Sequence, residues 1–570
     1  MSSSASDPTG GATSPDERSA GGLQYWGPAI AVSLSMFIAV IDSTLMNVAI
    51  PALVVDLDTT VTVIQGAITF YSMVMAALIL PGGKLPSMYG IRRLMTVTLI
   101  VYGVGTLLAA VSWNPAVLYL GWSLIEGAAA AVLLPLTFTV LVVSYDGRDR
   151  AKALGILAGV NAAGAAIGPL LGGAVTTFAS WRWGFALEAI IVVVALAFVR
   201  YLPAERLQET RLRLDVGGTV LSILGTTTLV AGILLASRYG WVLARRPFVV
   251  AGVQFNPFGT SPTVWLVAIG LFTYAAFVQY ELRLEAAGRD PLVPIRVLKN
   301  TTFTAGIVTN TTRSMVMAGF IFVIPVFLQS GVGYTAFETG LAMLPFSVGT
   351  FVASIYTTGW RRYVSPKTLV QGGTVLMGVG LLSLVGQTSI ELTFAELFVP
   401  MALFGLGLGL VMGQLIDMTL SAVGTHDAAA ASGVLNATAM LGYSFGTAIV
   451  GAYLLRDFYG NVVDGVLLAS GAAVSGARRD ALVVALEDAA ETATSQTQQE
   501  LLSRLPPDQQ ELLARVFEAA IVEAQRAALL LLTLFVLLVL LSSTLLPRVA
   551  PTLDDDPERR EADRDAADHE

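Results

Sequence analysis

The chain has 570 residues, of which 55% are hydrophobic and only 13% charged, and its mean hydropathy is +0.71. Soluble domains carry about a quarter charged residues and cannot hide so much apolar surface in one chain, so the composition predicts a protein embedded in lipid. The net charge of −8 argues against a nucleic-acid partner, and a chain with no cysteine and two histidines lacks the usual ligands for metal or thiol chemistry. We expect no metal and no cofactor.

Residues 1–24 are rich in Ser, Gly, Asp and Ala and are expected to form a disordered cytoplasmic leader. A spanning helix needs about 20 mostly apolar residues. Such stretches lie, in chain order, at roughly 28–50, 61–81, 93–111, 117–141, 151–175, 183–203, 215–236, 262–280, 302–328, 338–357, 366–386, 396–421, 429–453 and 525–547. This pattern predicts an all-α polytopic protein with fourteen transmembrane helices.

The loops after the even-numbered stretches hold most of the Lys and Arg, including Lys84 and Lys152. Cytoplasmic loops carry such an excess, so both chain ends are expected in the cytoplasm, including the acidic tail 551–570. Segment 454–524 then lies outside the cell. Its later part alternates apolar and charged residues around Pro506 and Pro507, and two readings stay open: an amphipathic helical hairpin over the outer surface, or a solvated loop.

The fifth stretch carries the strongest local signal. Gly164, Gly168 and Gly172 fall four residues apart, so one helix face becomes a groove without side chains, which lets a neighbouring helix approach closely. Pro169 removes a backbone donor and bends the helix, and Gly173 follows the groove. The run predicts either a working pivot or ordinary close packing.

This run resembles the antiporter motif of the major facilitator superfamily, written gxxxGPxxGG. Further segments resemble the 14-helix drug:proton antiporter branch of that family. They are Ile41 to Pro51 (LDxTIVNVALP in the branch), Trp181 to Phe185 (WRWxF), Pro291 to Pro294 (PLVP), Pro325 to Gln329, Gly340 to Pro345, and Ala431 to Asn436 with Gly442 and Gly446. The matches cover residues from about 28 to 453.

The resemblance implies a major facilitator fold with two six-helix bundles and two inserted helices. The boundaries would be 25–205 for the N-terminal bundle, 206–282 for the inserted pair and 283–550 for the C-terminal bundle. It also implies a cytoplasmic gate loop after the second helix, here Gly83, Ser87, Gly90, Arg92 and Arg93.

The chain departs from the family pattern at five positions. Ser87 stands where the gate loop has an aspartate, Ser123 where the fourth helix has an arginine linked to proton coupling, and Gly66 where the second helix has a tryptophan. In addition, Glu126 replaces a glutamine and Glu188 an asparagine. The family's coupling residues therefore cannot be carried over as a set.

Ionisable groups at membrane depth are costly and usually face a cavity or a partner. By counting helical residues, we place Asp42 past the middle of the first helix, Glu126 near the midplane of the fourth, and Glu188 in the outer part of the sixth. Arg313 is expected near the midplane of the ninth helix and Asp417 near the inner mouth of the twelfth.

Glu126 is the first choice for a proton carrier, because a carboxyl group in a dry cavity favours its protonated form. Asp42 is expected either to titrate or to attract a cationic substrate. Arg313 is expected to be a counter-charge to Glu126 or Asp42, or a handle for an anionic substrate. Glu188, Asp417 and Asn161 complete the candidate substrate and charge partners, and each has a structural alternative as a packing or rim residue.

Together these features predict a proton-coupled exporter of small hydrophobic or cationic compounds such as drugs. It is expected to work as a monomer in the plasma membrane by alternating access. A second reading is export of an anionic or lipid-like metabolite with altered ion coupling. A third is a non-transporting membrane sensor or scaffold. The sequence has no phosphate-binding loop signature and no clustered catalytic set, so an enzyme is not expected.

Overall fold

The computed structural model describes residues 22–145, 147–202, 215–250, 253–289, 291–360, 363–423, 428–492 and 503–548. Most of the expected leader and the whole acidic tail 551–570 lie outside these residues. Within the described ranges, thirteen helices are long and apolar enough to cross a membrane, and α6 contributes a further apolar stretch, Ile167–Phe178. The expected set of spans is confirmed.

The first six spans are formed by the following helices: α1 (Gly22–Asp56), α2 (Val61–Tyr89), α3 (Ile91–Ala110), the continuous α4 (Pro115–Leu118), η2 (Tyr119–Glu126) and α5 (Gly127–Ser144), α6 (Gly147–Phe178) and α7 (Arg182–Val199). The inserted pair is α8 (Val216–Tyr239) and α9 (Pro262–Ala286). The last six spans are α10 (Thr301–Ser330), α11 (Ala336–Ala342) with α12 (Leu344–Trp360), α13 (Pro366–Gln387), α14 (Phe394–Leu420), α15 (Ala428–Ser470) and α18 (Pro507–Ser543).

Polar residues mark where many of these helices begin. The side chains of Thr60 and Asn300 accept hydrogen bonds from the first free backbone N–H groups of α2 and α10. Pro262, Pro366 and Pro507 each occupy the first turn of a helix, where the missing donor costs nothing. These local signals set the helix starts, while lipid and neighbouring helices cover the apolar faces.

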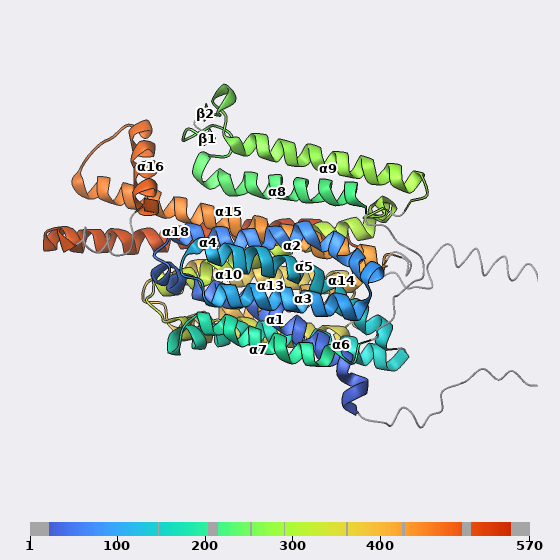
Figure 1. Cartoon of the computed structure of the whole chain (residues 1–570). Helices are drawn as coiled ribbons and strands as arrows, with labels where there is room; N and C mark the ends of the chain where they lie inside the picture. Colours follow the sequence, from blue (N-terminus) through green and yellow to red (C-terminus); the bar gives the residue numbers. More distant parts are fainter. Residues whose placement is uncertain are drawn as a thin grey trace, which may run out of the picture.

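Figure 1 shows the long helices running side by side, with α8 and α9 forming a separate layer on one flank. The two halves of the chain meet where α2 packs against α15, α6 against α11 and α12, and α1 against α10. We call the end of the array that holds Lys84, Arg92 and Lys367 the basic end, and the opposite end the far end.

The segment expected outside the membrane is largely helical in the residues that the structure describes, but its helices do not form the expected hairpin. α15 continues without a break to Ser470, and α18 begins at Pro507, so both helices project beyond the array at the far end (Figure 1). A short helix, α16 (Gly476–Thr492), lies between them and is joined to α15 by an ion pair from Arg479 to Asp464, with N–O distance 2.6 Å. The two prolines do not interrupt a hairpin. They mark the start of α18.

Candidate functional site

Three buried carboxyl groups meet inside the first six-helix group. Asp42 comes from α1, Glu126 from the end of η2, and Glu188 from α7, and their side chains are at most 1% exposed. One oxygen from each lies within 4.8 Å of the others. We call these three residues the carboxyl triad. Counting residues had placed them at different depths. In the structure each of the three lies within four residues of the middle of its span, so they share one depth.

Few polar groups satisfy the triad. Trp122 Nε1 donates to Asp42 Oδ1 at 2.7 Å, and Thr106 Oγ1 donates to Glu188 Oε2 at 3.3 Å. Among the described residues, neither oxygen of Glu126 has a partner at hydrogen-bond geometry, and no Lys or Arg forms an ion pair with the triad. Sequence reasoning missed Trp122 and Thr106, because nothing in their neighbourhood along the chain distinguishes them from core residues.

This arrangement cannot hold three negative charges. Two carboxylates 4.8 Å apart repel each other by roughly 3.5 kcal/mol at an effective dielectric constant of 20, and burial adds a desolvation cost for each charge. Full ionisation of the triad is therefore unfavourable while it is closed and dry. If water or a cation reached the triad, the ionisation equilibrium of its carboxyl groups would shift toward the carboxylates. The chemistry that it supports is reversible proton or cation binding.

A π-helical segment positions Glu126. Residues Tyr119–Glu126 form wider turns than an α-helix, a feature that often occurs at functional sites. The facing helix α3 comes so close that a Cβ atom on Gly105 would lie 2.8 Å from the backbone nitrogen of Glu126. A side chain at this position would push η2 away, so Gly105 fixes the depth of Glu126 in the bundle.

Two departures from the family pattern have local explanations. Ser123, at the arginine position, donates to the carbonyl of Ala67 at 2.9 Å and so joins η2 to α2. Gly66, at the tryptophan position, makes room for Tyr119, because a Cβ atom there would lie 2.3 Å from the Tyr119 hydroxyl. That hydroxyl donates to the carbonyl of Val63 at 2.8 Å. Small residues thus occupy the arginine and tryptophan positions of the family pattern, and they allow close helix packing.

The glycine groove of α6 packs directly on the helix that carries Asp42. Cβ atoms on Gly164, Gly168 and Gly172 would meet Val40 at 3.1 Å, Thr44 at 1.9 Å and Leu45 at 2.9 Å, all on α1. On the other side of α6, a Cβ atom on Gly173 would lie 2.2 Å from the carbonyl of Ala336.

The second half of the chain approaches α6 equally closely. A Cβ atom on Gly340 would meet the carbonyl of Pro169 at 2.5 Å. The motif helix is therefore held between α1 of one bundle and α11 of the other, without side chains at the contact. Such an arrangement allows two bundles to touch closely and still move past each other.

The expected gate loop lies at the basic end. Gly90 ends α2 with a positive φ of 82°, and Arg92 and Arg93 are exposed at the start of α3. Gly83 lies in the last turns of α2, and the side chain of Ser87 is outside the part that the structure describes. Lys84 donates to the carbonyl of Pro291, in the segment between α9 and α10. A lysine thus joins the gate loop to the linker of the second bundle.

The remaining candidates do not join the triad. Arg313 is 7% exposed and donates to Asn310 Oδ1 at 3.0 Å and to Ser314 Oγ at 3.0 Å, so it is not the counter-charge of Glu126 or Asp42 in this structure. Asn161 is half-buried and donates to Met36 Sδ at 3.5 Å, and Asp417 is exposed near the end of α14. Arg182 pairs with Asp56 and donates to the carbonyl of Ser112 at 2.7 Å, which links α7 to the far ends of α1 and α3.

Two glutamines that the sequence analysis did not single out as site residues connect the bundles at the far end. Gln65 Nε2 donates to the carbonyls of Thr447 at 2.9 Å and Ala448 at 3.3 Å, and Gln329 Nε2 donates to the carbonyl of Val48 at 2.8 Å. Together with the Gly173 and Gly340 contacts, they hold the far end closed. Gln329 lies in a segment that resembles the family pattern, whereas Gln65 carries no sequence signal.

Replacing both glutamines with leucine is expected to favour opening of the far end. Each lost amide hydrogen bond costs about 1 kcal/mol, so the double change should raise the open fraction at least tenfold. Because the chain has no cysteine, spin labels on cysteines introduced at the exposed Asp58 and Ser389 report the distance between the bundles. The variant should show a longer distance, and Gln387→Leu, on an exposed side chain, serves as control. An unchanged distance distribution would exclude this role.

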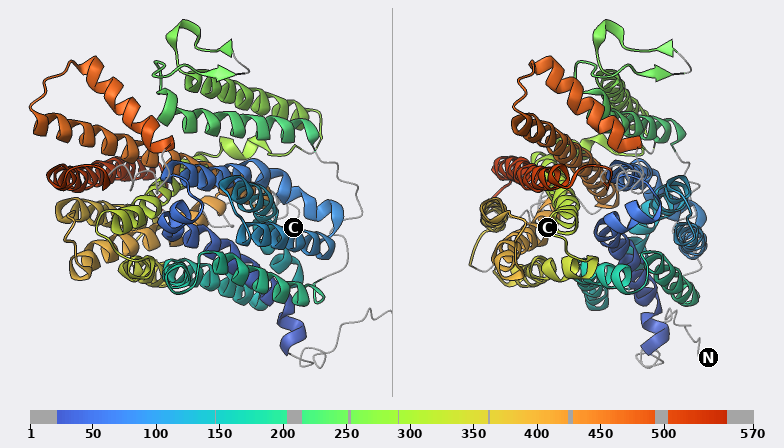
Figure 2. Two further views of the ribbon diagram at one scale, coloured as in Figure 1. Left: turned by 60° about the vertical axis from the view of Figure 1, so that its left-hand side comes forward. Right: turned by 90° about the vertical axis from the view of Figure 1, so that its left-hand side faces the viewer.

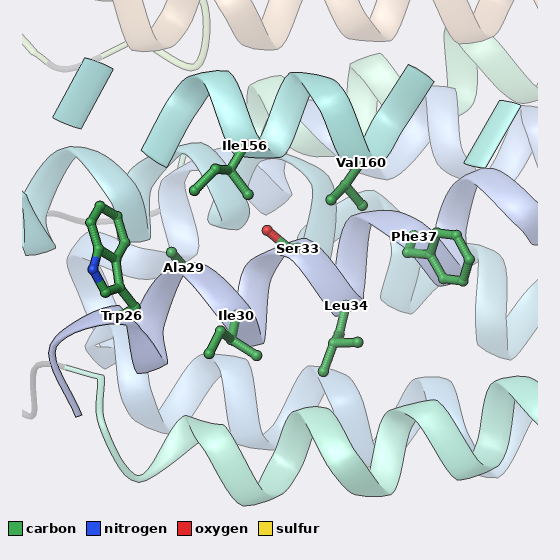
Figure 3. Close-up of a pocket in the computed structure, with 8 residues that line it drawn as sticks. All are labelled: Trp26, Ala29, Ile30, Ser33, Leu34, Phe37, Ile156 and Val160. Atoms are coloured by element: carbon green, nitrogen blue, oxygen red, sulfur yellow. The ribbon is translucent and has the colours of Figure 1, made fainter. Parts of the chain in front are cut away.

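An apolar cleft of about 390 Å³ lies between α1 and α6. Figure 3 shows Ile156 and Val160 of α6 pointing toward Ala29 and Ser33 of α1. The cleft runs along α1 from Trp26, near the basic end, to Phe37, which would contact a Cβ atom on Gly164 at 3.5 Å. The Ser33 hydroxyl has no hydrogen-bond partner among the residues that the structure describes. This lining suits an apolar ligand with at most one polar group facing it.

The helix array, the glycine groove and the buried carboxyl groups agree with the match to a protein-family model. The model described as Major Facilitator Superfamily matches residues 32–447. The chain belongs to this superfamily. It is a multi-pass transporter of small molecules in the plasma membrane and not an enzyme. The matched residues end inside α15, so the projecting parts of α15 and α18 lie outside the shared region.

Several relatives have names that refer to resistance or export. The puromycin resistance protein pur8 of Streptomyces alboniger is 28% identical over 75% of this chain and 81% of its own length. The cephamycin export protein CmcT of Amycolatopsis lactamdurans is 30% identical over 73% of this chain and 82% of its own. The quinolone resistance protein NorB of Staphylococcus aureus is 28% identical over 75% of this chain and 88% of its own.

Solved structures show the same fold at low sequence identity. A bacterial homologue of the human lysosomal transporter Spinster, in an inward-facing and unoccupied conformation, has a TM-score of 0.54 at 12% identity, covering 92% of this chain and 98% of its own. An auto-inhibited peptide transporter of the POT family has a TM-score of 0.55 at 13% identity, covering 90% and 96%. The major facilitator fold expected from the sequence is confirmed.

Proposed function

We propose that the protein is a proton-coupled exporter, an antiporter of small hydrophobic or cationic compounds, in which the carboxyl triad carries the proton. The observation that carries this proposal is the convergence of Asp42, Glu126 and Glu188 within 4.8 Å, buried and with no cationic partner in the part of the chain that the structure describes. A static core would gain nothing from three such groups, since each costs free energy to bury. A proton carrier needs groups whose protonation depends on whether the site is dry.

Glu126 has the central role in this proposal. Among the described residues neither of its oxygens has a partner at hydrogen-bond geometry, so its proton is the least restrained in the triad. Asp42 has Trp122 as a partner and Glu188 has Thr106, which hold these two carboxyl groups in place. Glu126 is the group whose proton is exchanged when water reaches the triad.

The helix contacts suggest how proton binding and transport are coupled. Asp42 lies on α1 between Val40 and Thr44, which touch the glycine groove of α6. α6 in turn touches α11 of the second bundle. A change in the charge of the triad would therefore act on the helix that separates the two bundles. With the far end facing outward, as loop charge predicts, opening it would break the Gln65 and Gln329 contacts and hydrate the triad from outside.

Substrate chemistry follows from the apolar cleft and the relatives. The cleft between α1 and α6 is apolar and begins near the basic end, which we place in the cytoplasm. The names of three relatives refer to puromycin, cephamycin and quinolones. We therefore propose export of small, largely apolar compounds from the cytoplasm. One chain contains both bundles, so a monomer suffices.

A second candidate function rests on Arg313. This guanidinium group is buried in α10 with only neutral partners, and it would suit the anionic group of a metabolite or lipid-like substrate. In that case the triad, whose oxygens are also spaced to hold a cation, would take sodium instead of protons.

Proton flux in inside-out membrane vesicles tests the proposal. A pH-sensitive dye reports an imposed acid-inside gradient, and lipophilic cations, neutral drugs and organic anions are added in turn. We expect a lipophilic cation or a neutral drug to dissipate the gradient only when the intact protein is present. Uptake of organic anions driven by a sodium gradient, with no dissipation of the proton gradient, would favour the Arg313 candidate. If no compound moves protons but a sodium gradient drives uptake, proton coupling is wrong.

A further inference from the structure

The loop between the inserted helices forms a small hairpin at the far end. Strand β1 (Val249–Val250) pairs antiparallel with β2 (Val253–Gln254), and a single turn, η3 (Pro257–Gly259), leads into α9. Figures 1 and 2 show this hairpin extending sideways from the ends of α8 and α9, away from the two bundles. A segment in this position lies beside the protein at the level where the spanning helices end.

The hairpin exposes an unusual number of large apolar side chains. Phe258 is 93% exposed and Leu243 is 72% exposed. The full set, which we call the hairpin face, is Trp241, Val242, Leu243, Val249, Phe255 and Phe258. Exposing this face to water is unfavourable, because burying apolar surface contributes about 25 cal/mol of free energy per Å². Contiguous apolar patches on the surfaces of soluble proteins mark contact sites.

The backbone around Phe258 is built to hold this side chain outward. Phe258 has a φ of 55°, a left-handed conformation that a bulky residue rarely adopts. Asn256 stabilises the turn, since its Oδ1 accepts from the backbone N–H of Phe248 at 2.8 Å and its Nδ2 donates to the carbonyl of Thr260 at 3.2 Å. Such strain persists where surrounding contacts impose it, and it often marks a functional position.

We infer that the hairpin face is a lipid contact, inserted into the interfacial layer of the bilayer beside α8 and α9. The partner follows from continuity with the membrane-facing surface. α8 has 24 residues and spans about 36 Å, somewhat more than the roughly 30 Å hydrocarbon core, so its end at Tyr239 reaches the headgroup layer. Trp241 follows directly, and tryptophan is enriched at this depth.

The lipid contact also fixes a second part of the molecule. Arg246, on the same loop and 9% exposed in its side chain, pairs with Glu487 at 2.9 Å and with Asp488 at 2.7 Å on α16. It also donates to the carbonyl of Val484 at 3.3 Å. The hairpin therefore connects α16 to the membrane surface. Lipid contact at the hairpin face restrains the projecting parts of α15 and α18 from one side.

Single cysteines test this inference, because the native chain has none. Phe258→Cys and Leu243→Cys probe the hairpin face. Leu468→Cys is the matched control, since Leu468 is equally apolar and 85% exposed but lies near the end of the 43-residue α15, about 64 Å long and thus well outside the bilayer. Each variant of the full chain is labelled with a nitroxide and reconstituted into phosphatidylcholine and phosphatidylglycerol vesicles.

Collision with oxygen, which concentrates in lipid, is compared with collision with a water-soluble nickel chelate. We expect oxygen to dominate at both hairpin positions and the nickel chelate to dominate at Leu468. Equal nickel access at all three positions would place the hairpin in water and overturn the inference. Low access to both reagents at the hairpin, with dipolar broadening between labels, would mean contact with a second copy and would also overturn it. Neither outcome bears on proton coupling.

Discussion

Replacing Glu126 with glutamine is expected to reduce substrate-driven proton flux to the level of membranes without the protein. Glutamine keeps the size of the side chain and resembles a protonated carboxyl group, but it cannot release a proton. The closed structure should tolerate it, because it removes a buried group that repels Asp42 and Glu188 when charged. The measurement is the dye assay in inside-out vesicles, made with a compound that the unaltered protein transports.

The control for this variant is Glu511→Gln. Glu511 is exposed on the projecting part of α18 and pairs only with Arg515, one turn away. Its loss should leave the flux unchanged, because an exposed pair of this kind contributes little. Both variants should be recovered from the membrane in equal amounts and elute as single species. Full flux in the Glu126→Gln protein would mean that Glu126 is a packing residue and that another group carries the proton.

Replacing Gly168 with leucine is expected to abolish transport as well, for a different reason. A Cβ atom at this position would lie 1.9 Å from Thr44 Oγ1, so α6 and α1 would have to separate. Overpacking of this kind typically costs 1–3 kcal/mol or more, and here it falls on the contact next to Asp42. Substrate-driven flux and the thermal stability of the purified protein should both fall, and they are measured side by side.

Gly159→Leu is the matched control, because Gly159 lies on the same helix and nothing lies within 4 Å of its added Cβ. This variant should retain most of its transport. A third variant, Gly173→Leu, should open the far end, since its side chain would meet Ala336 of the opposite bundle. Normal transport in the Gly168→Leu protein would show that the groove is not a working interface.

Several properties of this protein follow from local sequence. Apolar stretches of about 20 residues are sufficient to predict spanning helices, because in lipid every backbone group must be satisfied within the helix. The glycine spacing around Pro169 predicted a close helix contact, and α6 makes it on both sides. The helix set and the fold are confirmed, while the domain boundaries and the cytoplasmic placement of both ends stay predictions.

The predicted spans 429–453 and 525–547 cover only part of α15 and α18, for a physical reason. Hydropathy marks only the part of a helix that faces lipid, so the polar continuations of α15 to Ser470 and of α18 from Pro507 could not be recognised as the same helices. Pro506 and Pro507 looked like an interruption, although a proline in the first turn begins a helix. In place of an outer hairpin, the described residues form two projecting helices, with α16 between them in the chain.

The amino-acid sequence by itself determined that this is a membrane transporter of the major facilitator type, and it identified Asp42, Glu126 and Glu188 as costly intramembrane charges. Only the tertiary structure brought these three residues within 4.8 Å, separated Arg313 from them and revealed Gln65 and Gln329 between the bundles. Distances between helices far apart in the chain depend on how their surfaces pack. In this protein, glycines such as Gly105 and Gly168, whose partners are invisible along the sequence, set those distances.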